Sequence, residues 1–418
     1  MVNNYSEKIY FALISLIPIT IVIGPSISLA TIVFIGLLII LNLFFDKNFN
    51  ILKENTLIIL LFFYIYLIFN SFIAIDIKVG ALRNFGFIRF ILLFLAINYF
   101  FYKYKNPENI FLVWTTTIFL IVFDSYIELI FGKNILGNIS PYKQRIVSFF
   151  IDEPIVGGYL LGFLFLIIGY LLKKIYGKSF VFKSITVLLI LISALCILLT
   201  GERSNALKCI LGFIFFFLIN QNIDFKNKII STFLIFLCFF IVILSSDYLK
   251  VRYGKQLFSN FFDENKRAEF VEGDLYIKLY KSGYAIFKDY PFFGVGNKNY
   301  RVVTSKKEYK KDNYFLSTHP HQFYFELLSE HGIIGSLILL SLLFILVFKN
   351  LKVIILSRNN IQLGCFVYLL ISFLPILPSG SFFGDFNSNL FWLNLSIMYS
   401  CNPKTNIFSQ QKASVSID

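Results

Sequence analysis

The chain has 418 residues, of which 57% are hydrophobic and only 15% are charged. A composition this apolar excludes a soluble domain with an ordinary polar surface. The formal net charge of +14 does not indicate nucleic-acid binding here, because membrane proteins concentrate Lys and Arg in their cytoplasmic loops. We therefore expect an integral membrane protein that binds membrane lipid and no nucleic acid.

Apolar runs long enough to cross a hydrocarbon core of about 30 Å recur along the whole chain. Such runs must be helical, because lipid offers no water to satisfy loose backbone groups. We expect the first run to be retained, since no cleavage-site pattern follows it. The sequence predicts an all-α, polytopic membrane protein with twelve spans, at 9–24, 26–44, 56–74, 84–102, 109–131, 154–172, 181–199, 205–220, 229–246, 321–348, 361–378 and 384–401.

The basic residues predict the orientation of these spans. With both termini in the cytoplasm, Lys and Arg are more frequent in the cytoplasmic connections than in the short external loops. The segments 132–153, 200–204 and 247–320 then lie outside. This predicts membrane helices over 1–246, an external loop with short amphipathic helices over 247–320, membrane helices over 321–401 and a cytoplasmic tail over 402–418.

The three histidines of the chain all lie within the segment 318–335. Thr318 is a suitable N-cap and Pro320 suits a first helical turn, so we expect His319 and His321 at the external start of a span. Histidine is well suited to accept a proton near neutral pH, which makes this pair a candidate general base. Metal binding is the weaker alternative, because no second ligand has a suitable spacing.

The third histidine, His331, lies ten residues beyond His321, or about 15 Å along a helix. We expect it to be buried and structural. Gly332 and Gly335 follow it and predict a smooth helix surface that a neighbouring segment can approach closely. The cysteines all lie in or at the ends of spans, and they predict neither a disulfide nor a zinc site.

Asp124 and Glu128 are four residues apart and therefore share one face of a predicted span. Acids within a span are expected to face the bundle interior or water. They could act directly in a site, or they could pair with an arginine such as Arg89 or Arg145 to hold helices together. Glu153, at the end of the following loop, is a further supporting candidate.

Arg203 is the single base in the tight external turn T-G-E-R-S-N-A at 200–206. A guanidinium beside the free N–H groups of a helix N-terminus suits a phosphate group. The alternative is a topology anchor whose side chain extends to lipid headgroups. We favour the anion site.

Two elements are predicted in the long external loop. Residues 273–289 have the pattern of an amphipathic helix that could lie on the membrane surface. Residues 289–300 form a Pro/Gly turn cluster, which is not a dinucleotide fingerprint because no strand and third glycine accompany it. The modest basicity of the loop fits either simple solvation or recruitment of anionic lipid-linked substrates.

These motifs together resemble those of the bacterial O-antigen ligase and polymerase superfamily. His321 and Gln322, followed after nine residues by Gly332 and after two more by Gly335, resemble its H-[N/S/Q]-x9-G-x-x-[G/T/Y] pattern. The upstream P-x-x-G-x-G turn at 291–296, the large external loop and the T-x-x-R-S arginine are also similar. The resemblance covers about residues 110–400.

The resemblance implies a GT-C-like membrane fold that carries an inverting glycosyltransferase. Such an enzyme moves a glycan from an undecaprenyl-diphosphate carrier to a sugar hydroxyl at the periplasmic face of the bacterial inner membrane. It implies His321 as the base, His319 as its helper, and Arg203 and Arg145 as ligands of the diphosphate. Neither a metal nor another cofactor is expected.

Three functional hypotheses follow. An O-antigen ligase would use lipid A–core as acceptor, and a polymerase would extend a carrier-linked glycan; the Gln322 motif favours the ligase. A transporter that uses intramembrane charges is the alternative from another class, although the chain shows no internal repeat. The family often has an arginine near 273–274, where this chain has Asp274 and Lys278, and Arg267 is the candidate substitute.

Overall fold

The computed structural model describes residues 2–142, 144–151, 153–259, 274–310, 314–315 and 317–410. These residues form helices and irregular segments without any strand, which confirms the predicted all-α class. Nine helical segments among them are long and apolar enough to cross a membrane. They contain α1 (Val2–Ile23), α2 (Pro25–Phe45), α3 (Asn55–Phe72), α4 with α5 (Ile77–Gly86, Ile88–Lys103), η2 with α6 (Pro107–Asn109, Ile110–Phe131), α7 (Val156–Ile175), α8 (Phe180–Leu199), α10 (Phe225–Ser245), and α16 with α17 (Phe323–Phe348, Leu351–Leu356).

The three other predicted spans are helices that are too short for this criterion. They are α9 (Arg203–Ile219), α18 (Asn360–Ser372) and α19 (Asp385–Ser400), with 17, 13 and 16 residues. The prediction that one span extends to residue 378 is wrong. Pro375 and Pro378 lack the N–H that a continuing helix needs, and the chain runs irregularly from 373 to 384.

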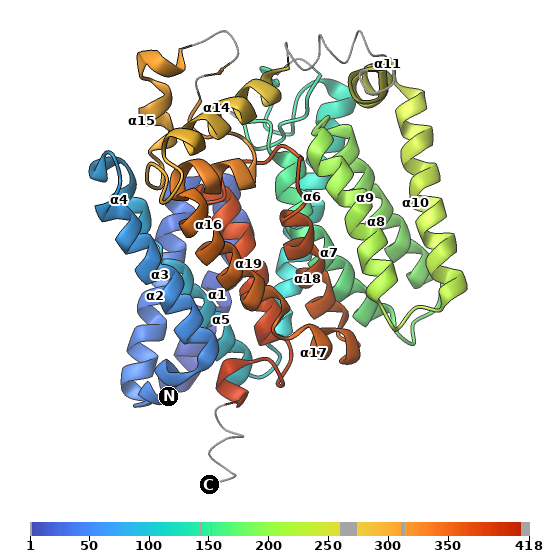
Figure 1. Ribbon diagram of the computed structural model, residues 1–418. Helices are drawn as coiled ribbons and strands as arrows, with labels where there is room; N and C mark the ends of the chain where they lie inside the picture. The colour runs from blue at the N-terminus through green and yellow to red at the C-terminus, as the bar shows by residue number, and fades with distance from the viewer. Residues whose placement is uncertain are drawn as a thin grey trace.

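The connections between the helices gather at the two ends of the bundle (Figure 1). The lower end in this view contains the start of α1, the end of α19 and α17. The upper end contains the connection after α6, the turn between α8 and α9, and the long segment between α10 and α16. The lower end is tied by the ion pairs Lys103–Asp46 (2.8 Å) and Lys173–Glu108 (2.7 Å), and η1 (Phe49–Lys53) belongs to one of its connections.

The long segment at the upper end is partly helical. Its described elements are α11 (Asp247–Leu249), η3 (Lys250–Ser259), α14 (Leu275–Asp289), α15 (Tyr300–Thr304) and η4 (Lys307–Tyr309). The predicted amphipathic helix is therefore confirmed as α14, and the Asp274 side chain caps its first turn. Its buried face packs on the start of α16, where Tyr280 stacks on Phe325 with ring centroids 5.2 Å apart.

Helix α16 is kinked at Gly332, whose φ of 63° lies in the left-handed region. A Cβ at this residue would lie 2.3 Å from the carbonyl carbon of Phe292, so only glycine fits. The predicted turn at 291–296 lies against the kink and supplies backbone partners: Ile333 donates to Pro291 (2.7 Å), and Gly296 donates to Glu330 (2.9 Å).

The second glycine of the motif makes a different close contact. A Cβ at Gly335 would lie 1.8 Å from the Tyr66 hydroxyl oxygen on α3. The expectation of close approach at both glycines is correct, whereas the smooth helix surface is interrupted by the kink. His331 is fully buried beside the kink, 3.3 Å from the Tyr66 hydroxyl through Nδ1, as expected of a structural histidine.

Candidate active site

The histidine pair lies in a turn immediately before α16. Helix α16 begins at Phe323 with Gln322 as its N-cap, so the predicted cap at Thr318 and the placement of Pro320 in the first turn are wrong. His321 itself has a left-handed φ of 53°, and this reversal delays the start of the helix. Non-glycine residues adopt this conformation at a cost of about 1–3 kcal/mol, and such residues gather at functional sites.

The two imidazoles are in contact, with ring centroids 3.9 Å apart and ring planes inclined by 37°. The Thr318 hydroxyl lies 3.0 Å from Nδ1 of His319, and the backbone N–H of Ser379 donates to the His321 carbonyl at 2.8 Å. Tyr276, near the start of α14, contacts the His321 ring edge-on at 6.3 Å. Segments distant in sequence therefore fix the pair from two sides.

The surroundings of the pair keep both imidazoles neutral. Burial lowers the pKa of His319 to about 3, and the charges of His321, Lys298 and Arg301 act in the same direction. Burial also lowers the pKa of His321 below its usual value of 6.5. Both rings therefore keep a free nitrogen lone pair at neutral pH, which a general base requires. A ring with a pKa of about 3 is a weak base, which favours His321 over His319 in this role.

Arg203 lies at the first residue of α9, near the histidine pair. Burial and the neighbouring Arg252 lower the pKa of its guanidinium, whereas Tyr276 and Asp274 raise it. Tyr276 therefore contacts His321 and also lies within electrostatic range of Arg203. Tyr276 thus links the candidate base to a cation.

Three arginines gather around Tyr253 in η3. Burial and the charge of Glu202 raise the pKa of Tyr253, whereas Arg252 and Arg145 lower it. Tyr253 also acts on Arg203. The two arginines predicted to bind diphosphate thus lie in one neighbourhood, and Arg252, which the sequence did not single out, joins them through a bond from its Nε to the Gly201 carbonyl (3.0 Å). We call Arg145, Arg203 and Arg252 the arginine cluster.

Glu202 holds the turn beneath this cluster. Its carboxylate accepts bonds from the backbone of Gly157 (2.7 Å) and Gly158 (3.1 Å) in the first turn of α7, and from the side chain of Asn205 (2.6 Å). A carboxylate at a helix N-terminus is favourable because it satisfies free N–H groups. The turn that presents Arg203 is therefore fixed to α7.

The predicted supporting acids do not join the site. Asp124 and Glu128 are buried as expected, but they accept bonds from the loop that follows α6 and pair with neither Arg89 nor Arg145 among the described residues. Glu153 is exposed in that loop. Arg267 lies outside the described residues.

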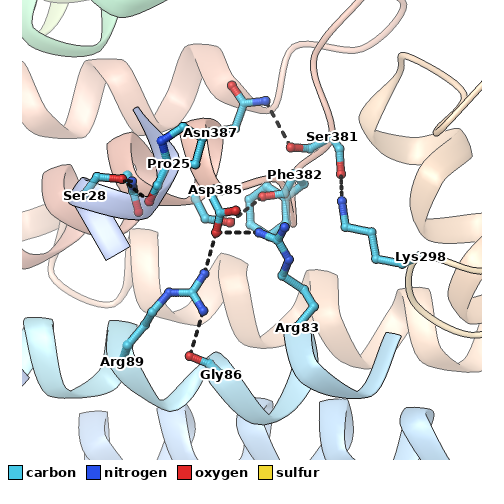
Figure 2. A network of polar contacts seen from close by, with 12 residues as sticks. Pro25, Ser28, Arg83, Gly86, Arg89, Lys298, Ser381, Phe382, Asp385 and Asn387 are labelled. Carbon is cyan, nitrogen blue, oxygen red and sulfur yellow. Dashed lines mark hydrogen bonds and ion pairs between the residues drawn. The ribbon is translucent and has the colours of Figure 1, made fainter. Parts of the chain in front are cut away.

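The structure adds two basic residues to the candidate site. Neither was predicted from the sequence, where one of them belongs to the Pro/Gly turn cluster at 289–300. Lys298 and Arg301 act on His319 from the side of α4 and α15. The Lys298 ammonium donates to the Ser381 hydroxyl at 3.3 Å (Figure 2). The only signal in the sequence was a lysine between two asparagines in an otherwise apolar turn.

The described residues contain no group of three or more His, Cys, Asp or Glu side chains placed to hold a metal ion. The arrangement offers instead a neutral imidazole pair with cations on both sides. Such a site can take a proton from a hydroxyl while it stabilises negative charge that develops on a neighbouring group.

The family model described as O-antigen ligase matches residues 188–340. This segment begins in α8 and ends in α16, so it contains both histidines, Arg203, Arg252 and Lys298, whereas Arg145 lies outside it. The resemblance found in the motifs is confirmed over this segment, where the chain is similar to O-antigen ligases. A comparison with curated proteins finds no match.

Proposed function

We propose, on the basis of this relation, that the protein is a membrane glycosyltransferase with a lipid-linked donor. It moves a glycan from undecaprenyl diphosphate to a sugar hydroxyl at the periplasmic face of the bacterial inner membrane, and it acts as an O-antigen ligase on lipid A–core. The observation that carries the proposal is the pair of contacting histidines, linked through Tyr276 to Arg203, within the segment that is similar to O-antigen ligases.

In the proposed reaction, the acceptor hydroxyl oxygen bonds to the anomeric carbon of the donor. The bond from that carbon to the phosphate oxygen breaks, with inversion, and undecaprenyl diphosphate leaves. An imidazole nitrogen of His321 takes the hydroxyl proton, which contributes a factor of about 10²–10⁴ to the rate. The His319 ring lies against this ring, so it orients the base and helps to exclude water from it.

The arginine cluster would bind the diphosphate. A guanidinium offers two parallel N–H groups to phosphate oxygens, and it keeps its charge throughout the reaction. Charge develops on the leaving diphosphate in the transition state, so cations fixed in advance stabilise that state more than the ground state. Glu202 supports this role, because it holds the turn that presents Arg203.

The test is a transfer assay with the purified full-length protein in phospholipid vesicles. The donor is an undecaprenyl-diphosphate glycan, and the acceptor is either lipid A–core or a second carrier-linked glycan. We expect transfer to lipid A–core; transfer to the carrier-linked glycan alone would make the protein a polymerase. No transfer to either acceptor, with a working ligase run in parallel, would refute the proposal.

The matched variants are His321→Asn and Lys307→Gln. Lys307 is exposed in the same long segment, so its replacement controls for an unspecific effect of altering this region. His321→Asn should reduce kcat by about 10²–10⁴ and leave donor binding within about twofold. If the protein were a transporter, neither the wild type nor the variants would transfer a glycan.

A further inference from the structure

We propose that Lys298, Arg301 and Arg83 form a second oxyanion site, which binds an acidic group of the acceptor substrate. The chemical class is a phosphate or carboxylate on the acceptor glycan. This inference rests on the proposed function and extends it to the acceptor. Figure 1 places α4 and α15, which contain Arg83 and Arg301, on the left, and α9 and α11, near the arginine cluster, on the right. The starts of α14 and α16 lie between them.

The position of Lys298 is fixed by its two neighbours. Asn297 and Asn299 are buried, and the backbone N–H of Asn297 donates to the side-chain oxygen of Asn70 on α3 at 2.7 Å. The Asn299 side chain accepts from the backbone of Asp76 at 2.8 Å. Lys298, between them, has a left-handed φ of 66°. The backbone is therefore held in a costly conformation that directs one lysine toward the loop before α19.

That loop links Lys298 to the histidine pair. Ser381 accepts from the Lys298 ammonium at 3.3 Å, and Ser379 donates to the His321 carbonyl at 2.8 Å. The two serines are two residues apart, so these contacts lie within about 7 Å of each other along the chain. An anion at Lys298 would hold its substrate close to the candidate base.

The exposed side of this region is basic. Figure 2 shows Arg83 and Arg89 sharing the Asp385 carboxylate, at 2.6 and 2.7 Å, which leaves one positive charge in excess. The Arg89 side chain is only 9% exposed, but that of Arg83 is 27% exposed and can reach a ligand. Arg301 is exposed, and both it and Arg83 act electrostatically on Lys298. The buried carboxylates of Glu326 and Glu330 act on Lys298 with the opposite sign, so the positive charge open to a ligand lies on the exposed side.

One buried polar atom in the loop between Lys298 and the histidines has no hydrogen-bond partner among the residues that the structure describes. It is the hydroxyl of Ser379. The Ser379 backbone, in contrast, bonds to the His319 ring and donates its N–H to the His321 carbonyl. An unpaired buried polar atom costs about 1–3 kcal/mol. A substrate hydroxyl or oxyanion that entered between the histidines and Lys298 would satisfy the Ser379 hydroxyl, so this atom indicates a ligand.

The experiment compares acceptors that differ only in charge. The probes are lipid A–core with its phosphates, the same acceptor after phosphatase treatment, and a second carrier-linked glycan with its diphosphate. Lys298→Gln and Arg301→Gln should each raise KM for one of the charged acceptors about tenfold, which corresponds to about 1.4 kcal/mol. If KM rises for lipid A–core, the site binds its phosphates; if KM rises for the carrier-linked glycan, the site binds the diphosphate of that acceptor. KM for the phosphatase-treated acceptor and for the donor should stay unchanged.

Lys307→Gln is the control, because it removes an exposed charge from the same segment. An equal loss with charged and uncharged acceptors, or a lower unfolding temperature with unchanged KM, would show a purely structural cluster and overturn the inference. A higher KM for the donor alone would assign the cluster to the donor instead. Equilibrium binding of phosphorylated lipid A–core without donor tests the site even if no transfer occurs, so failure of this inference is distinguishable from failure of the proposed function.

Discussion

Helices α6 and α16 each contain two carboxylates four residues apart near the upper end of the bundle. Asp124 and Glu128 lie on α6, and Glu326 and Glu330 lie on α16. All four are buried, with at most 5% of the residue exposed. The sequence pattern is the same, yet only the second pair lies in the candidate site.

The pair on α6 holds a loop. Asp124 accepts from the backbone of Ile135 (2.8 Å) and from the hydroxyl of Ser148, while Glu128 accepts from the backbone of Val147 (3.2 Å) and Ser148 (2.5 Å). No basic side chain is recorded against either carboxylate among the described residues. This pair is a structural anchor for the connection that also presents Arg145.

The pair on α16 also holds a loop, but it faces a cation as well. Glu326 accepts from the Ser381 hydroxyl and from the backbone of Phe382 (2.8 Å), and Glu330 accepts from the backbone of Tyr300 (3.3 Å). Both carboxylates act on Lys298. Two carboxylates near the end of a span therefore indicate that a loop is anchored there. A basic side chain close to them, such as Lys298, indicates that the pair also belongs to the candidate site.

The largest expected difference between the two helices concerns the glycines beyond each pair. Gly132 ends α6 with φ 71° and has open space around it, whereas Gly332 kinks α16 against Phe292. Gly132→Ala should lower the free energy of unfolding by about 1–2 kcal/mol, from the left-handed backbone alone. Gly332→Ala adds a clash and should cost at least about 3 kcal/mol. Thermal unfolding in detergent measures both, and equal costs would contradict the close packing at the kink.

The next difference concerns the carboxylates. Glu128→Gln and Glu326→Gln each weaken two charge-assisted hydrogen bonds, so each should lower the free energy of unfolding by about 2 kcal/mol. Only Glu326→Gln removes a charge that acts on Lys298, so only this variant should change KM for the acceptor. A change of acceptor KM in Glu128→Gln would remove the proposed division between anchor and site.

Part of this picture could be predicted from the sequence. The helices followed from apolar runs, and the histidines and Arg203 followed from motifs with fixed spacing. Lys298, Arg252 and Tyr276 could not be predicted, because their relation to the site arises from packing between segments far apart in the chain.

The errors have local physical causes. The cap at Thr318 was predicted because a threonine before a proline suits a helix start, but the left-handed turn at His321 leaves no trace in the residue type. Asp124 and Glu128 were expected either to act in a site or to pair with an arginine, because acids are costly in lipid. The structure shows that backbone N–H groups of a returning loop can meet that cost without an arginine.

The pH dependence of stability should also differ between the α6 region and the α16 region, because all three histidines lie in or near α16. A folded-state pKa of about 3 for His319, against 6.5 unfolded, stabilises the fold above pH 6.5 and is lost as the pH falls toward 3. The protection factors for hydrogen exchange in the segment 373–384 should therefore fall as the pH is lowered from 7 to 5, while those of 132–151 change less. The acid limb of kcat/KM should lie below pH 6.5, since burial lowers the pKa of His321. A limb above pH 6.5 would contradict the neutral base.

The smallest expected effect concerns two serines, each of which bonds to the first carboxylate of its pair. Ser148 donates its hydroxyl to Asp124, and Ser381 donates its hydroxyl to Glu326. Each Ser→Ala change leaves a buried carboxylate with one bond fewer, so both should lower the free energy of unfolding by about 1–2 kcal/mol. Ser381 also accepts from the Lys298 ammonium, so Ser381→Ala alone should raise KM for a charged acceptor, by about two- to fivefold. If the two variants lost stability equally and neither changed KM, the bond from Lys298 would be part of the loop anchor, and the α16 pair would differ from the α6 pair only in its location.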